Sequence, residues 1–257
     1  MMQNGVKIMR LKWMPEQTLI LDGDSVCFIS CYNADKDTLP LDMFICEGER
    51  NTEVTILAKE YVEEYVESIL EATGCDKVEI YLTTGRENFR YTVDPAYKSN
   101  RKLSKYPTGL NQIKDHLLTL YDGELCKEYE ADDICVLRAK DENTLLSAID
   151  KDVLMQSVGT HYNYKKNEYI TVTKEEAEKF LWIQMIQGDT ADGIYGIEGM
   201  GIKKATAFLS SIEPTLYYNS VLDLYKSKGK SKKEFLSNLN LLDMHLLQKD
   251  GRIKLHE

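Results

Sequence analysis

Two short apolar runs in this chain each end in a pair of aspartates. The first is residues 18–21 followed by Asp22-Gly-Asp24, and the second is residues 144–149 followed by Asp150-Lys-Asp152. A run of this kind is typical of a strand that is buried on both faces of a parallel sheet. Because ligands bind at the carboxyl edge of such a sheet, we expect the aspartates to line a ligand site.

Helical and strand patterns alternate along most of the chain. Residues 59–72 repeat apolar side chains every three or four positions before Gly74, whereas residues 77–83 read as a strand. A hairpin is expected within 158–172, followed by a helix over 174–187 that begins with a capping box. Short helices are expected beyond Gly188. These patterns predict an α/β fold with a central, mostly parallel sheet flanked by helices.

Acidic residues gather in four clusters along a chain whose formal net charge is -10. One such cluster at a helix start has a plain explanation, since carboxylates there complement the helix dipole. Four clusters at strand ends and helix starts instead indicate a cation site. Oxygen ligands without neighbouring His or Cys favour Mg²⁺ or Mn²⁺ over Zn²⁺. The candidate metal ligands are Asp22, Asp24, Glu130, Asp132, Asp133, Asp150, Asp152, Asp189 and Asp192.

A glycine-punctuated stretch follows the last acidic cluster and leads into a helix. Its glycines allow backbone amides to approach an anion at the helix N-terminus, and two lysines add positive charge. A plain connector between helices is the alternative. The candidate phosphate-binding residues are Gly196, Gly199, Gly201, Lys203 and Lys204. A lysine-rich run over 225–233 reads as a solvated loop, with a DNA contact as the alternative.

The cysteines and the apolar segments indicate where in the cell the protein is located. The six cysteines show no C-x-x-C spacing, which indicates reduced cysteines in a cytosolic protein. The N-terminus lacks a signal-peptide pattern, and no apolar stretch reaches the roughly 18 residues that a membrane span requires. We therefore expect a soluble, cytoplasmic protein that does not bind a membrane.

Six motifs follow one another along the chain, namely Asp22-Gly-Asp24, Phe89-Arg90, Tyr97-Lys98-Ser-Asn-Arg101, Glu130-Ala-Asp-Asp133, Asp150-Lys-Asp152 and Gly188-Asp-Thr-Ala-Asp-Gly193. Their order resembles the 5′-nuclease superfamily, which comprises flap endonucleases, the 5′-nuclease domains of bacterial DNA polymerases and phage 5′-to-3′ exonucleases. The resemblance spans about residues 18 to 208. Within the superfamily, the chain resembles the phage exonucleases most.

The resemblance implies a nuclease core over residues 1–187 and a helical DNA-binding region over 188–257. The core would include a helical arch at about residues 86–121, through which or beside which the 5′ strand passes. Two Mg²⁺ or Mn²⁺ ions would bind the scissile phosphate. The first would be held by Asp22, Glu130 and Asp132, and the second by Asp133, Asp150, Asp152, Asp189 and Asp192. A K⁺ ion is expected at the glycine turn.

In the arch, the resemblance implies catalytic roles for Arg90, Lys98 and Arg101 and base stacking by Tyr97. The implied function is 5′-to-3′ hydrolysis of duplex DNA at a 5′ end, nick or flap, independent of sequence. Flap endonuclease or RNA-primer removal, with an RNA–DNA hybrid as substrate, is the alternative among enzymes. The protein is expected to act as a monomer without a nucleotide cofactor. The resemblance to phage exonucleases implies a phage-encoded protein in the cytoplasm of the host.

One position departs from the family pattern. The aspartate that the family carries at the end of its second strand falls on Thr83, whose side chain has no charge. Either Asp24 supplies the missing carboxylate, or the first metal ion binds weakly. A DNA-binding relative that has lost catalysis is a third possibility, and a ribonuclease of the related toxin class is disfavoured by the arch and the glycine turn.

Overall fold

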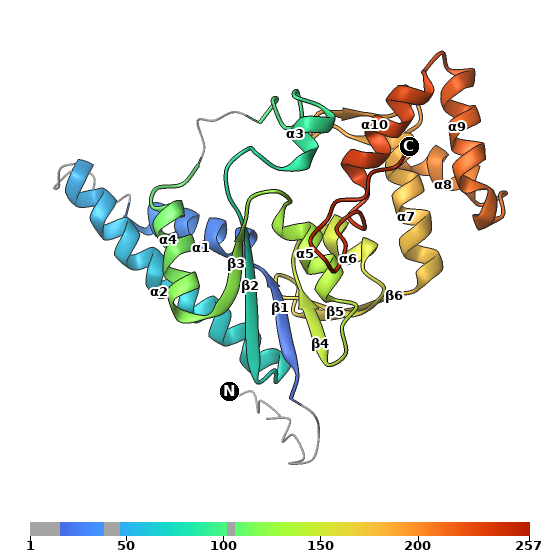
Figure 1. Cartoon of the computed structure of the whole chain (residues 1–257). Coiled ribbons are helices and arrows are strands. Elements are labelled where there is room, and N and C mark those ends of the chain that lie inside the picture. Colours follow the sequence, from blue (N-terminus) through green and yellow to red (C-terminus); the bar gives the residue numbers. More distant parts are fainter. Residues whose placement is uncertain (1–15, 39–46, 102–105) are drawn as a thin grey trace.

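The computed structural model describes residues 16–38, 47–101 and 106–257 (Figure 1). Its centre is a six-stranded sheet in the order β3-β2-β1-β4-β5-β6, in which only the β5–β6 pair is antiparallel. The expected α/β fold with a mostly parallel sheet is confirmed. The strands are β1 Thr18–Asp22, β2 Lys77–Thr83, β3 Asp122–Cys126, β4 Thr144–Ser147, β5 Gly159–Asn163 and β6 Glu168–Val172.

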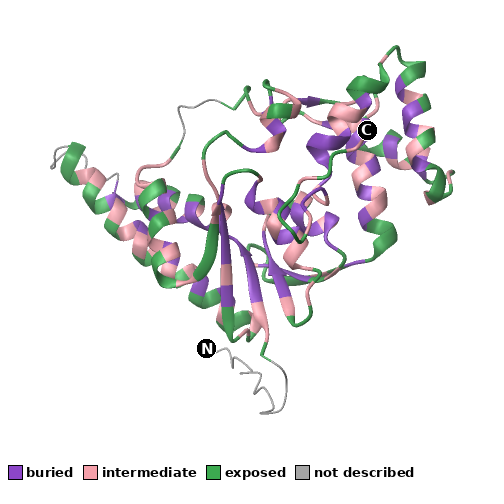
Figure 2. Cartoon of the chain, in the orientation of Figure 1, coloured by how far each residue is buried: buried purple, intermediate pink, exposed green. Residues whose placement is uncertain are grey.

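Strand β1 lies at the middle of the sheet because its side chains are apolar on both faces. Leu19 and Leu21 face one layer, and Ile20 faces the other, as the alternation of a strand requires. All three are fully buried (Figure 2). In register, Leu21 lies opposite Ile80 of β2 and Ser147 of β4, so the carboxyl ends of these strands meet at one edge of the sheet.

Helices cover both faces of the sheet (Figure 1). The face that contains Leu19 and Leu21 is covered by α1 Gly23–Thr38, α2 Glu47–Thr73 and α4 Leu110–Leu120. The face that contains Ile20 is covered by α5 Ala131–Arg138 and α6 Lys151–Gln156. None of the described helices is long and apolar enough to cross a membrane.

A second core forms around α7 Lys174–Gln187. Its aromatic centre includes Trp182, which stacks on Phe235, and Tyr225, which meets Phe235 edge-on. The helices that pack there are α8 Ile202–Leu209, α9 Tyr217–Ser227 and α10 Lys232–Leu242, with a short 3₁₀ helix, η3 Pro214–Leu216. The division of the chain at residue 187 remains a prediction.

The sequence patterns predicted several elements well and missed others. The hairpin and α7 lie where expected, and the Thr173–Glu176 capping box is present. Gly74 follows α2 at a φ of +67°, as a stop signal should, but α2 starts twelve residues earlier than the pattern indicated. The edge strand β3 and the two-stranded pair β7 Gly188–Asp189 and β8 Ile194–Tyr195 were not expected.

Part of the predicted arch lies outside the described residues. Within residues 86–121, residues 102–105 are not described, and the described remainder holds α3 Phe89–Val93 and α4. Cys46 also lies outside the described residues, whereas Cys27, Cys31, Cys126 and Cys135 are free thiols. Helix α3 begins at Asn88, whose side chain accepts a hydrogen bond from the backbone of Arg90.

Candidate active site

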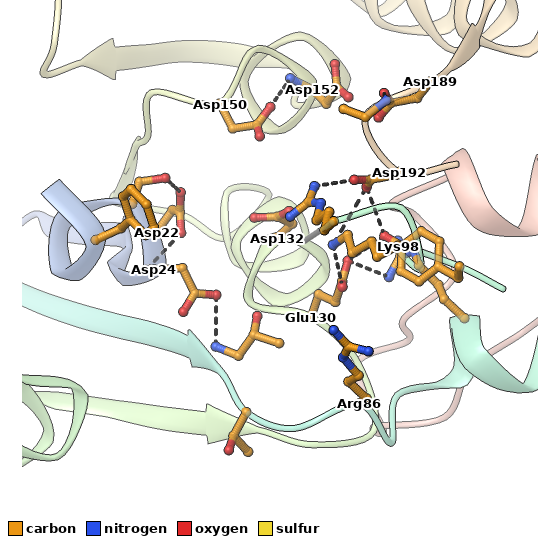
Figure 3. A pocket seen from close by; sticks show the side chains of 18 of the residues that line it. Asp22, Asp24, Arg86, Lys98, Glu130, Asp132, Asp150, Asp152, Asp189 and Asp192 are labelled. Atoms are coloured by element: carbon orange, nitrogen blue, oxygen red, sulfur yellow. Dashed lines mark hydrogen bonds and ion pairs between the residues drawn. The ribbon is translucent and has the colours of Figure 1, made fainter. Parts of the chain in front are cut away.

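A cavity of about 1100 Å³ opens where the carboxyl ends of β1 and β2 meet the loops before α5, α6 and β8 (Figure 3). Eight of the nine predicted metal ligands line it, and they come from four separate parts of the chain. Only Asp133 is absent from the lining. The fold therefore brings together acidic clusters that are more than 100 residues apart in sequence.

Helix starts hold two of these acids in place. Asp22 ends β1, and its carboxylate accepts hydrogen bonds from the backbone N–H of Asp24 at 3.1 Å and from the Ser25 hydroxyl at 2.9 Å. Asp150 caps α6 by accepting the backbone N–H of Asp152 at 2.7 Å. An aspartate at such a position satisfies amides that the helix itself leaves unpaired. Both acids are thus fixed at the cavity by local structure.

Burial and mutual repulsion make this cluster costly to ionise. Burial, the Asp24 charge and the Asp150 charge raise the pKa of Asp22 to about 7. Burial, Asp150 and Asp189 raise the pKa of Asp152 to about 6. The pKa of Asp132 is raised well above its ordinary value by burial and by the charges of Asp22 and Asp150. A divalent cation would reverse this repulsion, so the donor chemistry fits such an ion.

The acids form an open arrangement rather than a closed cage. Within the described ranges, no three Asp, Glu, His or Cys side chains lie close enough together to enclose one metal ion. Mg²⁺ commonly keeps several waters and binds through one or two carboxylates plus phosphate oxygens. The arrangement therefore fits an ion whose coordination is completed by water and by a phosphate ligand.

Two predicted catalytic cations, Lys98 and Arg101, line the cavity and are paired with acids. The Lys98 ammonium lies 2.6 Å from the Glu130 carboxylate and 3.7 Å from that of Asp192. Arg101 forms an ion pair with Asp192. The backbone N–H of Lys98 also donates to the carbonyl of Asp192 at 2.9 Å. The segment before residue 102 is thus fastened to the loop that carries the last acidic cluster.

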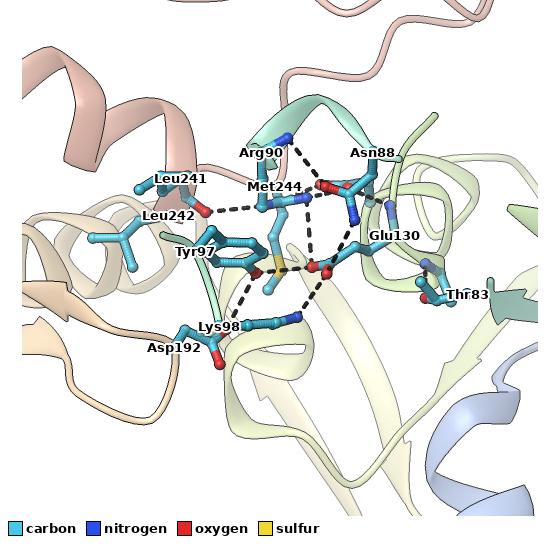
Figure 4. A network of polar contacts seen from close by, with 12 residues as sticks. Thr83, Asn88, Arg90, Tyr97, Lys98, Glu130, Asp192, Leu241, Leu242 and Met244 are labelled. Carbon is cyan, nitrogen blue, oxygen red and sulfur yellow. Dashed lines mark hydrogen bonds and ion pairs between the residues drawn. The ribbon is translucent and has the colours of Figure 1, made fainter. Parts of the chain in front are cut away.

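The structure corrects the assignments of Arg90 and Asp133. The Arg90 guanidinium donates to both carboxylate oxygens of Asp133, at 2.6 and 2.7 Å, and its third donor binds the Leu241 carbonyl at 2.9 Å (Figure 4). Arg90 is 1% exposed and Asp133 is fully buried. Because each charge is satisfied by the other, Asp133 is not a free metal ligand and Arg90 is not a catalytic residue. The pair instead fixes α3 and α5 to the end of α10.

The base-stacking role expected of Tyr97 is also wrong. Its side chain is 4% exposed and packs in the second core, where it meets Tyr91 edge-on at 5.4 Å. Its hydroxyl donates to Glu130 at 3.0 Å and lies 3.2 Å from Asp192. A ring enclosed in this way has no open face for a base. Tyr97 therefore orients two acids of the cavity.

The position that departs from the family pattern has a structural role of its own. The Thr83 hydroxyl accepts the backbone N–H of Ala131 at 2.9 Å and so holds the start of α5. Asp24 lines the cavity, but its carboxylate is paired with Lys114 at 2.5 Å. In the free protein a cation thus compensates the charge of Asp24, and its role as the replacement metal ligand stays a prediction.

The glycine turn has the conformation that a tight turn requires. Gly199 has a φ of +73°, and its carbonyl accepts the Lys204 ammonium at 2.8 Å. Gly196 approaches the backbone of Gly188 so closely that a Cβ would lie 2.4 Å from its nitrogen. Gly199 is therefore favoured by its positive φ, and Gly196 by the lack of space for a side chain.

The start of α8 is open to solvent. Gly201 is the N-cap residue of α8, its φ of -68° suits any residue, and a Cβ there would meet nothing within 4 Å. Gly199 is equally open, and Lys203 is exposed. This space leaves room for an anion at the helix N-terminus. The phosphate-binding role of the turn remains a prediction.

Sequence reasoning missed several residues of the cavity wall. Phe28 and Tyr106 line it with exposures of 41% and 63%. Arg86 follows β2, lines the cavity and is exposed, and within the described ranges it has no acidic partner (Figure 3). Phe28 had one signal in the sequence, since it lies four residues after Asp24 on the same helix. Lys114 had none, because its partner Asp24 is 90 residues away.

The chain is similar in sequence to named nucleases over part of its length. It is 31% identical over 150 residues to the exodeoxyribonuclease of Enterobacteria phage T3, covering 54% of this chain and 48% of that protein. It is 27% identical over 165 residues to the flap endonuclease Xni of Shewanella baltica, covering 57% of this chain and 62% of that protein. The chain thus spans about half the length of the T3 relative. No protein-family model matches it.

The fold is also similar to that of a solved nuclease. The T5 5′-exonuclease, solved with divalent metal ions (zinc) bound, superposes with a TM-score of 0.65 at 18% identity. The match covers 89% of this chain and 90% of the other. At this identity the likeness establishes the fold alone.

Proposed function

We propose that the chain is a metal-dependent 5′-to-3′ exonuclease acting on duplex DNA. Its motif order resembles the 5′-nuclease superfamily, its sequence relatives are named nucleases, and its fold is similar to that of a 5′-exonuclease. The observation that carries the proposal is the cavity in which eight acids from distant segments face two paired cations. Such a cavity suits hydrolysis of a phosphodiester, whose charge the cations and bound metal would offset.

Motif position suggests how the acids would be shared between two ions. Asp22 and Asp132 would hold a first divalent ion together with Glu130, and Asp150, Asp152, Asp189 and Asp192 would hold a second. When bound, Mg²⁺ or Mn²⁺ would supply positive charge at the phosphate and a water of lowered pKa. The T5 5′-exonuclease, which has a similar fold, was solved with divalent metal ions (zinc) bound, which supports the use of a divalent ion.

Lys98 and Arg101 act in this proposal as substrate-positioning cations. In the free protein they neutralise Glu130 and Asp192, which otherwise face other carboxylates across the cavity. A phosphate that enters the cavity offers the same donors a second acceptor, and the paired acids then become available to metal. Both side chains can thus guide the scissile bond towards the acids.

The glycine turn and α8 would hold the duplex backbone away from the reacting bond. Exposed amides at the start of α8, with Lys203 beside them, suit a phosphate and read no base. A K⁺ ion at the turn and a monomeric state belong to the same proposal. The expected substrates are duplex ends, nicks and flaps, with RNA–DNA hybrids as a further substrate.

Product lengths test the proposal and its alternative. The protein is incubated with Mg²⁺ and duplex, nicked, 5′-flap and RNA–DNA hybrid substrates that carry an end label. An exonuclease releases mononucleotides and short products from 5′ ends, whereas a flap endonuclease, as the Xni relative is named, releases the flap as one piece. Binding without cleavage on all four substrates would identify a DNA-binding relative that has lost catalysis.

A further inference from the structure

A half-buried lysine lies in the wall of the cavity at the end of β2. The Lys114 ammonium, from α4, lies 2.5 Å from the Asp24 carboxylate and donates to the Thr83 carbonyl at 2.6 Å. The second oxygen of Asp24 accepts the backbone N–H of Thr83 at 3.0 Å. Three separate segments, namely α1, the end of β2 and α4, therefore meet at this ammonium group.

The lysine lines the cavity and has one more N–H donor than the described contacts use. An ammonium group has three N–H donors, and Asp24 and Thr83 use two of them. In the part of the chain that the structure describes, the third has no partner. The Lys114 side chain is 14% exposed and lines the same cavity as Asp22 and Asp132. Its charge is thus fixed in position beside the acids rather than free in solvent.

The pair explains how the chain differs from its family at Thr83. A carboxylate at the end of β2 would have added negative charge to this wall. Here the hydroxyl of Thr83 holds α5, and Asp24 is neutralised by a cation. The wall at β2 therefore presents a positive donor where the family pattern has a metal ligand.

We propose that Lys114 is a phosphate-binding residue of this cavity, with Asp24 as the anchor that positions it. Its third N–H contacts a phosphate oxygen of the nucleic-acid strand, next to the phosphate that the acidic cluster would hold. This inference rests on the proposed nuclease function. The competing interpretation is that Lys114 only masks the charge of Asp24.

Binding without cleavage separates the inference from the nuclease proposal. The affinity for a 5′-phosphorylated oligonucleotide is measured in EDTA over a range of salt concentrations for the wild type, Lys114→Met and Lys114→Arg. Loss of one phosphate contact lowers the slope of log affinity against log salt by about 0.7 to 0.9. We expect this loss in Lys114→Met and not in Lys114→Arg. No binding by the wild type would defeat the nuclease proposal itself.

A matched control is Lys249→Met. Lys249 pairs with Asp141 at 2.9 Å, and neither residue lines the cavity. Its removal should leave the salt slope unchanged, although it also removes one positive charge. If Lys114→Met and Lys249→Met give the same slope, Lys114 does not contact phosphate and the inference is wrong.

The Mg²⁺ requirement of cleavage supplies a second readout. If Lys114 binds phosphate, Lys114→Met slows cleavage about tenfold or more at saturating Mg²⁺, while the Mg²⁺ concentration for half-maximal rate stays the same. If Lys114 only masks Asp24, its removal frees a carboxylate and lowers the Mg²⁺ requirement. A lowered Mg²⁺ requirement would overturn the inference. Asp24→Asn should behave like Lys114→Met only if Lys114 binds phosphate.

Discussion

The Arg90–Asp133 ion pair shows most directly how single residues are used in this protein. Because both charges are buried, removal of one leaves the other without a partner in a medium of low polarity. We predict that Arg90→Met lowers the free energy of unfolding by about 3 to 5 kcal/mol, measured by urea denaturation.

Lys249→Met, which breaks an exposed ion pair, should cost less than about 1 kcal/mol under the same conditions. In addition, Arg90→Met combined with Asp133→Leu should recover part of the loss, since an apolar pair removes the unpaired charge. A stability of Arg90→Met within about 1 kcal/mol of the wild type would contradict the structural role and reopen the catalytic one.

The roles of some single residues could not be predicted from the sequence. The acidic clusters were recognisable because each lies at a strand end or helix start, which local pattern reveals. The Arg90–Asp133 pair joins residues 43 positions apart, and no local pattern shows that one carboxylate of a cluster is already neutralised. Tyr97 was misassigned for the same reason, since its burial arises from α7 and the C-terminal helices.

At the scale of elements, two glycines of the turn before α8 have different roles: one shapes the backbone, and the other leaves the start of the helix open. Gly199 needs a positive φ, whereas Gly201 does not and faces open space. We predict that Gly201→Val lowers duplex affinity at least tenfold by blocking the amides of α8, while unfolding free energy changes by less than about 1 kcal/mol. Filter binding and urea denaturation measure the two quantities.

The control is Gly48→Val, because Gly48 also has open space around it and lies at the start of α2. It should leave duplex affinity unchanged. Equal affinities for Gly201→Val and the wild type would show that the α8 start does not bind the duplex. The Mg²⁺ requirement should be the same in all three proteins, since the turn contributes no acid to the cavity.

Elements with strong local signals were predicted, and elements set by distant packing were not. Strand β1 is a continuous apolar run, and α7 begins at a capping box, so both were readable. Strand β3 is an edge strand whose first three residues are exposed, and it lacks the alternation that marks a half-buried strand. The first turns of α2 are polar. They form because the rest of the helix packs against α1.

At the scale of the whole molecule, the C-terminal segment contacts α6, because the backbone N–H of Met244 donates to the Gln156 side chain at 3.1 Å. The Asp243 carboxylate lies 2.8 Å from the His256 ring and accepts the backbone N–H of His245 at 2.8 Å. Burial alone would raise the pKa of Asp243, but the hydrogen bonds from His256 and His245 outweigh it and lower the pKa below its ordinary value of 3.8.

A group with a lowered pKa stabilises the fold above the pKa of the unfolded chain, and this contribution is lost as the pH falls through the folded value. We therefore predict that Asp243→Asn destabilises the protein at pH 6 and that the difference from the wild type shrinks below pH 3.8. Urea denaturation at pH 6 and pH 3 measures both. A difference that grows on acidification would contradict this account.

The central claim, that the converging acids hold metal for cleavage, is tested most directly by one double variant. Asp132→Asn with Asp152→Asn removes two charges from the cavity without changing the size of either side chain. Cleavage of a 5′-labelled duplex is followed against Mg²⁺ concentration, and duplex affinity is measured in parallel. We predict that the variant loses at least a thousandfold in rate at every Mg²⁺ concentration and binds the duplex at least as tightly as the wild type. A variant that cleaves at the wild-type rate would contradict the claim.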